Sequence, residues 1–220
     1  MPISSILCYN PSFMGIKPKT NKKAIKPSAT ENTTSKLSEK EKMLSGIMYS
    51  PIDKELLSDK MRAKKLCFRY NSMPPENYTE MKQVLRSLLG KIGQKVWIEQ
   101  NFKCDYGYNI EIGNNFFSNY NLVILDTAKV KFGDNVLIGP NCGFYTPNHP
   151  RDAKLRATGI QNSKPITVGN NVWIGGNVTV LGGVKIGDNV IVGAGSVVTK
   201  DLPSNTICCG VPCKVIKQNK

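Results

Sequence analysis

The sequence lacks two features that would each define a class of protein. It has no apolar run near the roughly 18 residues that a bilayer span needs, so a membrane protein is excluded. It also has a single histidine, His149. Structural zinc sites draw on clusters of His and Cys, and Cys209 and Cys213 have no second pair at ligand spacing. We therefore expect no metal, and read these cysteines as small buried residues.

Acidic residues and signs of secretion are also scarce. Only 16 Asp and Glu oppose 30 Lys and Arg, which gives a formal charge of +14 and favours anionic partners. No charged start followed by an apolar stretch and a cleavage site is present. The seven cysteines, an odd number, suit reduced thiols better than a disulfide framework. These absences predict a cytoplasmic protein.

The first 37 residues differ in composition from the rest. Residues 1–37 are rich in Lys, Ser, Thr, Asn and Pro, with five Lys and no acid before Glu31. Such a composition predicts a disordered basic tail. Organellar targeting by this tail is the less favoured alternative, because it contains no Arg and no clear amphipathic helix.

Residues 38–92 have the spacing of helices. Ser38-Glu39-Lys40-Glu41 is a capping box, which predicts a helix start at Ser38. Apolar residues then recur near helical spacing on either side of Ser50-Pro51, which predicts two short helices. A third helix is expected to end at Gly90. The apolar positions are Met43, Leu44, Ile47, Leu56, Leu57, Met61, Leu66 and Cys67 in the first two, and Met81, Val84, Leu85, Leu88 and Leu89 in the third.

From about residue 96 apolar residues recur with a period of six. The longest series is Val168, Ile174, Val180, Ile186, Val192 and Val198. A second series of small or β-branched residues lies four residues after each position of the first except the last. Earlier residues show the same period, but the repeat is shifted by two residues between Ile124 and Phe132. Six residues form one flat side of a triangular coil, so every sixth side chain points inward. Gly, Asn-Asn and Asp-Asn at the corners allow tight turns. An ordinary sandwich of strands needs no such period.

The repeat is interrupted once, by the polar segment 145–165 that contains His149. A long excursion from a regular solenoid is usually functional. The predicted organisation is therefore a tail at 1–37, a helical region at 38–92, and a coil at 96–217 with an extruded loop at 145–165.

These motifs together resemble the hexapeptide-repeat acyltransferases, in particular the maltose, galactoside and nodulation-factor O-acetyltransferase branch. The segments that carry the resemblance are 41–71, 115–126, 145–150 (YTPNHP), 165–176, 193–201 and 210–217. The resemblance implies a mainly β fold, a left-handed parallel β-helix with an N-terminal helical region. It also implies a homotrimer with active sites between subunits, and transfer of acetyl from acetyl-CoA to a sugar hydroxyl.

Residue roles follow from the same resemblance. His149 matches the family's catalytic histidine, and a neutral imidazole can take a proton from an attacking hydroxyl without an acyl-enzyme. Asn119 is expected to hold the acceptor and the tetrahedral state, and Asp126 to orient the acceptor or the histidine. Arg62 is a weaker candidate for acceptor contact. Hydrogen bonding at a coil corner is the alternative for Asn119 and Asp126, and a solvated helix face for Arg62.

Donor contacts are also carried over. The residues are Trp173, Gly176, Ala194, Thr199, Lys200, Lys214 and Lys217. Backbone groups near Gly176 are expected to bind the pantetheine arm and the developing oxyanion, and the three lysines to neutralise CoA phosphates. Packing is the alternative role of Trp173 and Ala194.

Some residues depart from the family pattern. Thr127 stands where the galactoside branch often has Asp, and Gln161 where a carboxylate is common, so the orientation of His149 is open. Lys214 and Lys217 replace frequent arginines and lose the bidentate fork.

Two other functions fit parts of the sequence. The β-helical carbonic anhydrases need three histidines per zinc site, and one His excludes them. A non-catalytic scaffold that binds nucleic acid through the tail is the remaining alternative, but the tail lysines are not interleaved with aromatic residues. We therefore expect no nucleic-acid partner.

Overall fold

The computed structural model describes residues 37–220, and the predicted tail lies outside the described residues. Three helices come first: α2 (Glu39–Leu44), α3 (Lys54–Asn71) and α4 (Tyr78–Leu88). The predicted capping box is confirmed, because the Glu41 N–H donates to Ser38 Oγ at 3.1 Å and the Ser38 N–H donates to Glu41 Oε2 at 2.7 Å. Helix α3 has 18 residues, longer than the short helix expected from the sequence.

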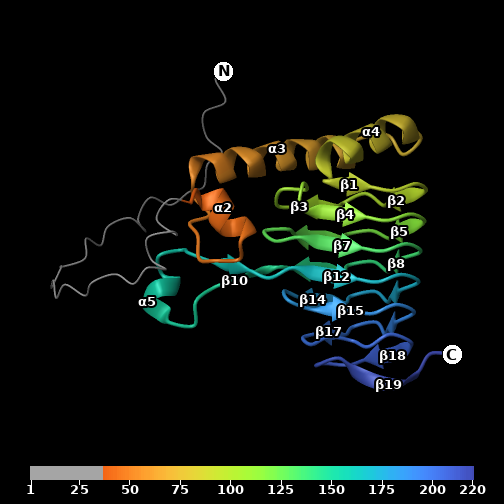
Figure 1. Cartoon of the computed structure of the whole chain (residues 1–220). Helices are drawn as coiled ribbons and strands as arrows, with labels where there is room; N and C mark the ends of the chain where they lie inside the picture. Colours follow the sequence, from red (N-terminus) through yellow and green to blue (C-terminus); the bar gives the residue numbers. More distant parts are fainter. Residues whose placement is uncertain (1–36) are drawn as a thin grey trace. The chain divides into compact units, whose positions relative to one another are not determined.

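Helices α3 and α4 cover one end of the coil (Figure 1). Most of their buried residues, among them Cys67 and Tyr70 on α3 and Val84 and Leu88 on α4, belong to the same apolar cluster as the interior of the coil. The Tyr70 hydroxyl also donates a hydrogen bond to the Ile98 carbonyl. The helical region is therefore a cap that shields the first coil from water.

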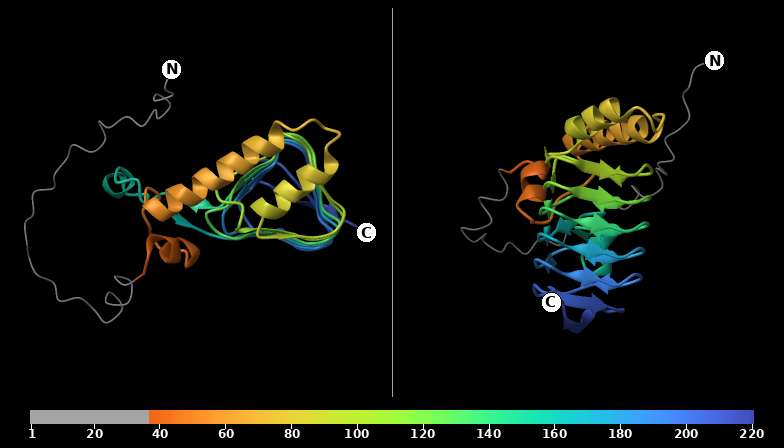
Figure 2. Two further views of the ribbon diagram at one scale, coloured as in Figure 1. Left: turned by 90° about the horizontal axis from the view of Figure 1, so that it is seen from above. Right: turned by 90° about the vertical axis from the view of Figure 1, so that its right-hand side faces the viewer.

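The coil has three faces, each a stack of short strands (Figure 2). The first face holds β1 (Lys91–Ile92), β4 (Ile110–Ile112), β7 (Val130–Phe132), β12 (Ile166–Val168) and β15 (Lys185–Ile186). The second face holds β2 (Val96–Ile98), β5 (Phe116–Ser118), β8 (Leu137–Ile138), β13 (Trp173–Ile174), β16 (Ile191–Val192), β18 (Thr206–Cys209) and β19 (Lys214–Gln218). The third face holds β3 (Lys103–Cys104), β6 (Val123–Leu125), β9 (Gly143–Tyr145), β14 (Thr179–Leu181) and β17 (Val197–Val198).

All strand pairs within the faces are parallel except the last. The predicted coil is confirmed, although it begins at β1 rather than at about residue 96. At the other end β19 runs antiparallel to β18 and covers the last coil, which the period of six does not predict. The chain thus turns back on itself where no further coil follows.

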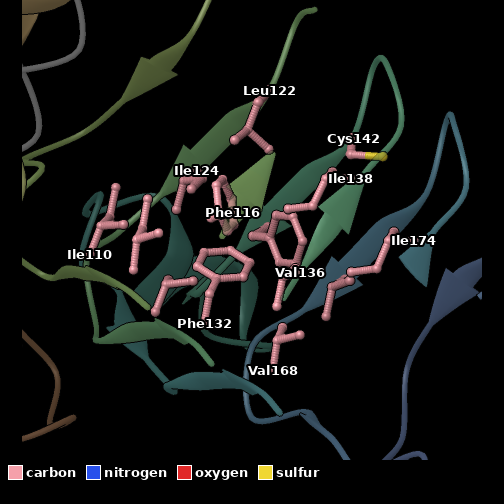
Figure 3. Packing of buried hydrophobic residues seen from close by; sticks show 14 of the residues in the cluster. Ile110, Phe116, Leu122, Ile124, Phe132, Val136, Ile138, Cys142, Val168 and Ile174 are labelled. Atoms are coloured by element: carbon pink, nitrogen blue, oxygen red, sulfur yellow. The ribbon is translucent and has the colours of Figure 1, made fainter. Parts of the chain in front are cut away.

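The period of six fills the interior with stacked side chains. Val168, Ile174, Val180, Ile186, Val192 and Val198 are each 2% exposed or less. Three rings form a column in which Phe132 lies between Phe116 and Phe144, with centroids 5.3 and 5.0 Å apart and edge-to-face angles of 67° and 82°. Figure 3 shows Phe116 and Phe132 among the aliphatic side chains that surround them. The predicted inward series is confirmed.

The two-residue slip has a structural cause. Val130 pairs with Ile110, a shift of 20 residues, whereas Lys185 pairs with Thr167, a shift of 18. The longer turns of the early coils lie between the third and first faces, at residues 105–109 and 125–129. These corners leave room for polar side chains beside the coil.

Asparagines form ladders along the coil corners. Asn115, Asn135 and Asn171 have φ of 53°, 58° and 56°, in the left-handed region. Asn115 Nδ2 donates to Asn135 Oδ1 at 3.0 Å, and Asn135 Nδ2 donates to Asn171 Oδ1 at 2.9 Å. Asn tolerates this backbone better than other residues with a side chain, because its amide bonds locally. The Asn pairs seen in the sequence are therefore corner residues, as predicted.

We expect Asn135→Ala to lower the free energy of unfolding by roughly 1–3 kcal/mol, because it loses two ladder bonds and strains the backbone. Asn135→Gly loses the same bonds but adopts a positive φ freely, so its loss is expected to be smaller. Urea unfolding of the two variants measures the difference. An alanine variant as stable as the glycine variant would mean that φ is not the source of the cost.

Candidate functional site

Two edges of the coil carry the residues that the sequence singled out. The edge between the third and first faces comprises residues 105–109, 125–129, 145–165, 181–184 and 199–201, and is called here the histidine edge. The edge between the second and third faces comprises residues 99–102, 119–122, 139–142, 175–178 and 193–196, and is called the asparagine edge. The third face separates them.

His149 lies at the start of a hairpin that leaves the histidine edge. Strands β10 (Pro147–Asn148) and β11 (Asn162–Ser163) pair antiparallel, and the short helix α5 (Ala153–Arg156) lies between them, away from the coil (Figure 1). The imidazole is exposed, and its Nδ1 is 3.2 Å from the Ile160 carbonyl oxygen. A carbonyl only accepts, so this contact needs the proton on Nδ1 and leaves the Nε2 lone pair free.

The carbonyl that orients His149 is itself held in place. The next residue, Gln161, pairs with Tyr49 through two backbone bonds of 2.9 and 3.1 Å, and the Gln161 amide also donates to the Tyr49 hydroxyl. Gln161 therefore bonds Tyr49 and not the imidazole. The side chain of Gln161 thus leaves the backbone contact between Ile160 and His149 in place. Sequence reasoning missed Tyr49, because no local pattern links it to a loop 112 residues away.

A cluster of buried hydroxyls braces the base of the hairpin. Thr127 Oγ1 is 2.9 Å from Thr146 Oγ1 and 2.5 Å from Ser163 Oγ. Thr146 Oγ1 in turn donates to the Leu125 carbonyl and accepts from the Ala128 N–H. Thr127, the residue that departs from the galactoside pattern, thus links two corners of the coil to the strand β11.

Asp126 is fully buried in the corner 125–129. Its carboxylate accepts from the backbone N–H groups of Asp105, Tyr106 and Asn109 at 3.0, 2.8 and 3.3 Å. Burial raises the pKa of Asp126 to about 7, the Tyr106 N–H opposes the rise, and the charge of Asp105 adds to it. These hydrogen bonds show that Asp126 stabilises the backbone of the corner 105–109. A direct contact between Asp126 and an acceptor stays a prediction.

The raised pKa gives folding stability a pH dependence. Below about pH 4 the carboxyl is protonated in both states, whereas between about pH 4 and 7 only the unfolded chain releases the proton. Stability is therefore lost as the pH rises through this window, by roughly 2–4 kcal/mol from this group. We expect Asp126→Asn to remove that fall in thermal or urea unfolding. Asp201→Asn, an exposed corner residue, is the matched control and should keep the slope of the parent protein.

The side chain of Arg62 donates hydrogen bonds to two backbone carbonyls. Its guanidinium donates to the carbonyls of Ser87 and Tyr106 at 2.9 and 3.2 Å, so it ties α3 to α4 and to the corner 105–109. One half-turn before it, Lys60 Nζ forms an ion pair of 2.7 Å with Asp105 Oδ1. Sequence reasoning missed Lys60 and Asp105, which are far apart in the chain and carry no motif. An acceptor contact by Arg62 stays a prediction.

The asparagine edge holds Asn119, Gly176 and Ala194. Asn119 Oδ1 accepts the Tyr120 N–H at 2.8 Å, the corner bond considered from the sequence. Successive coils approach closely here: a Cβ on Gly175 would lie 2.6 Å from the Ala194 nitrogen. Gly176 accepts from the Gly195 N–H at 2.9 Å. Small residues therefore keep this edge narrow, with main-chain groups near the surface.

The donor candidates are spread over the two edges and the second face. Trp173, 55% exposed, lies on the second face in one row with Ile191, Ile207 and Lys217, so the coil brings Trp173 and Lys217 to the same face. Lys214 lies on the same terminal strand β19. Thr199 and Lys200 follow β17 at the histidine edge. One chain therefore does not place all seven residues around a single groove.

The three faces differ in chemistry. The outward row of the first face is Lys91, Glu111, Lys131, Thr167 and Lys185. The second face instead presents Phe117, Leu137 and Trp173, which are 36%, 50% and 55% exposed. On the third face Leu125, Tyr145 and Leu181 form a row. The first face is therefore charged, whereas the second and third faces each expose a row of apolar side chains.

The described residues contain neither a cluster of metal ligands nor a membrane-spanning helix. Within residues 37–220, no three His, Cys, Asp or Glu side chains lie together as a metal site would require. In the same part of the chain no helix combines the length and apolar character needed to cross a bilayer.

A parallel coil with six-residue sides, a helical cap and a histidine hairpin at one edge defines a class, and the chain belongs to the hexapeptide-repeat acetyltransferases. Residues 42–93 match the maltose acetyltransferase hexapeptide capping motif, and residues 165–200 match the bacterial transferase hexapeptide of six repeats. The first match covers the helical cap and the second covers regular coils of the solenoid.

Individual proteins that are similar to this chain in sequence and structure are also acetyltransferases. Galactoside O-acetyltransferase of Escherichia coli K12 is 40% identical over 81% of this chain and 88% of its own length. A maltose O-acetyltransferase structure from Clostridium difficile 630 is 48% identical, has a TM-score of 0.83, and covers 84% of this chain and 98% of its own. A galactoside acetyltransferase solved with coenzyme A is 39% identical, has a TM-score of 0.81, and covers 84% and 92%.

Proposed function

We propose that the protein transfers acetyl from acetyl-CoA to a hydroxyl of a sugar of the maltose, glucose or galactoside type, with His149 as general base. The observation that carries the proposal is the exposed imidazole whose Nδ1 faces a fixed carbonyl. The relatives named for maltose and galactosides, one of them solved with coenzyme A, support the acceptor and donor classes.

The chemistry needs one proton transfer in each direction. Nε2 of His149 takes the hydroxyl proton as the acceptor oxygen attacks the thioester carbonyl. Main-chain N–H groups near Gly176, and Asn119, stabilise the negative oxygen of the tetrahedral state. The carbon–sulfur bond then breaks, and the imidazolium returns the proton to the CoA thiolate. The acetyl group never bonds to the protein.

The site is proposed to lie between subunits of a homotrimer. His149, Thr199 and Lys200 belong to the histidine edge, whereas Asn119 and Gly176 belong to the asparagine edge of the same chain. Association through the apolar second and third faces would bring the histidine edge of one chain to the asparagine edge of the next. The lysines then neutralise CoA phosphates from both sides of the cleft.

A thiol-release assay over mono- and disaccharides, aminoglycosides and serine tests the activity. We expect CoA release that depends on a sugar, with an acetyl ester found on that sugar by mass spectrometry. The proposed acceptor class would be contradicted if no acceptor in the panel gave CoA release. An amide product from an aminoglycoside would contradict it as well.

Mixing two inactive variants tests the shared site. His149→Ala and Asn119→Ala, unfolded and refolded together, would form mixed trimers in which some interfaces hold both native residues. Activity is expected to return in the mixture and not in either variant refolded alone. A mixture as inactive as its parts would show that both residues serve from one chain.

A further inference from the structure

Two buried cysteines face one another between the helical cap and the coil. Cys67 on α3 and Cys104 on β3 have sulfur atoms 3.7 Å apart, although the residues are 37 positions apart in the sequence. A disulfide has a sulfur–sulfur bond of about 2.0 Å, so the two atoms need to approach by only about 1.7 Å. Cys142, Cys208 and Cys213 are also buried, and Cys142 donates to the Gly175 carbonyl.

Bonds on both sides of the thiol pair hold it in register. One turn after Cys67, the Asn71 amide donates to the Phe102 carbonyl at 2.8 Å and accepts the Phe102 N–H at 3.1 Å. On the other side, Lys60 pairs with Asp105. Helix α3 is therefore fixed against β3 at two points that flank the sulfurs, which holds the two thiols side by side.

The pair is also reached from outside. Cys67 and Cys104 line a pocket of about 400 Å³ on the third face, together with Lys64, Phe68, Asn71, Lys103, Asp105, Val123 and Leu125. Lys64 and Lys103 line the pocket together with Asp105, so charges of both signs lie beside the thiol pair. The hydrogen bond between the two thiols lowers the pKa of Cys67, whereas the same contact and burial raise the pKa of Cys104. Of the two, Cys67 is therefore the thiol that loses its proton more readily.

From this contact we propose that Cys67 and Cys104 are a modification site: a dithiol that a peroxide oxidises to a reversible disulfide, which locks the helical cap onto the first coil. The Cys67 thiolate attacks one oxygen of hydrogen peroxide, which gives a sulfenic acid and hydroxide. The Cys104 sulfur then attacks the Cys67 sulfur and displaces the sulfenic oxygen as water. The two thiols lose two electrons, and the peroxide is reduced to two waters in all.

The lock has a physical consequence. A bond across 37 residues restricts the unfolded chain, and the two sulfurs are already 3.7 Å apart in the folded one. Oxidised protein is therefore expected to melt roughly 5–10 °C above reduced protein. Cys104 also precedes the corner 105–109 that Asp126 braces, so the oxidised form holds that corner more firmly.

The experiment uses the full chain with Cys8→Ser and Cys209→Ser, which removes the tail thiol and the exposed Cys209. After graded peroxide treatment and thiol blocking, trypsin should yield residues 66–69 cross-linked to residues 104–129, with the loss of two hydrogen atoms. Dithiothreitol should reverse the link and the rise in Tm. Cys104→Ser should abolish both, whereas Cys142→Ser should keep both.

Three results would overturn the proposal: no cross-linked peptide once other cysteines are oxidised, Cys67 recovered only as sulfinic acid, or a cross-link that leaves Tm unchanged. Each readout is independent of acetyl transfer, so failure of the proposed activity does not affect it.

Discussion

His149→Ala is expected to lower kcat by roughly 10²- to 10⁴-fold while CoA binding and thermal stability stay near those of the parent. The imidazole is exposed, and its one described polar contact is with the Ile160 carbonyl, so its removal leaves the core intact. What the variant loses is the base that accepts the hydroxyl proton. Initial rates of CoA release at saturating acceptor and donor measure the effect.

His149→Asn separates the loss of the base from the loss of the contact with the Ile160 carbonyl. Its amide N–H still donates to the Ile160 carbonyl, but it has no basic nitrogen, so it should be as slow as the alanine variant. Arg151→Ala, an exposed change on the same loop, should stay within a few-fold of the parent enzyme. If the asparagine variant kept full turnover, His149 would act only by holding the loop.

Phe132→Ala is expected to give the largest loss of stability, roughly 3–5 kcal/mol. Phe132 is 2% exposed and contacts two other rings edge to face, so its removal leaves a cavity that the rungs above and below cannot close. In a repeat protein each coil is stabilised by its contacts with the neighbouring coils, and Phe132 makes such contacts on both sides. Urea unfolding, followed by far-UV circular dichroism, measures the loss.

Phe132→Leu keeps much of the volume and should cost roughly 1–2 kcal/mol. The ratio of the two losses separates the cavity from the loss of aromatic contacts. Equal losses in the two variants would mean that ring geometry, and not filled volume, holds the column together.

Much of the fold follows from local sequence. A period of six with small or β-branched residues admits few other structures, since each inward side chain must meet an equivalent one a coil away. The capping box at Ser38 and the asparagine corners are equally local, because each depends on a few adjacent residues. The long corners 105–109 and 125–129 appeared in the sequence only as a slip, without their polar contacts.

The contacts within the site could not be read in this way. Lys60 meets Asp105, and Cys67 meets Cys104, only because α3 lies across the end of the coil. Tyr49 meets Gln161 because the segment between α2 and α3 pairs with the loop. None of these pairs has a periodic spacing or a motif. Asp126 was singled out for an acceptor, whereas its burial and its three backbone donors came from the packing of two corners.

The sequence by itself determined that the chain forms a coil with six-residue sides, and that its one histidine leaves the coil on a loop, because both depend on the order of residues along the chain. Only the tertiary structure decided which side chains meet across the cap, and that His149 and Asn119 lie on different edges of the third face. Those facts depend on how many residues each corner consumes, and a change of two residues at a corner shifts every later contact around the coil.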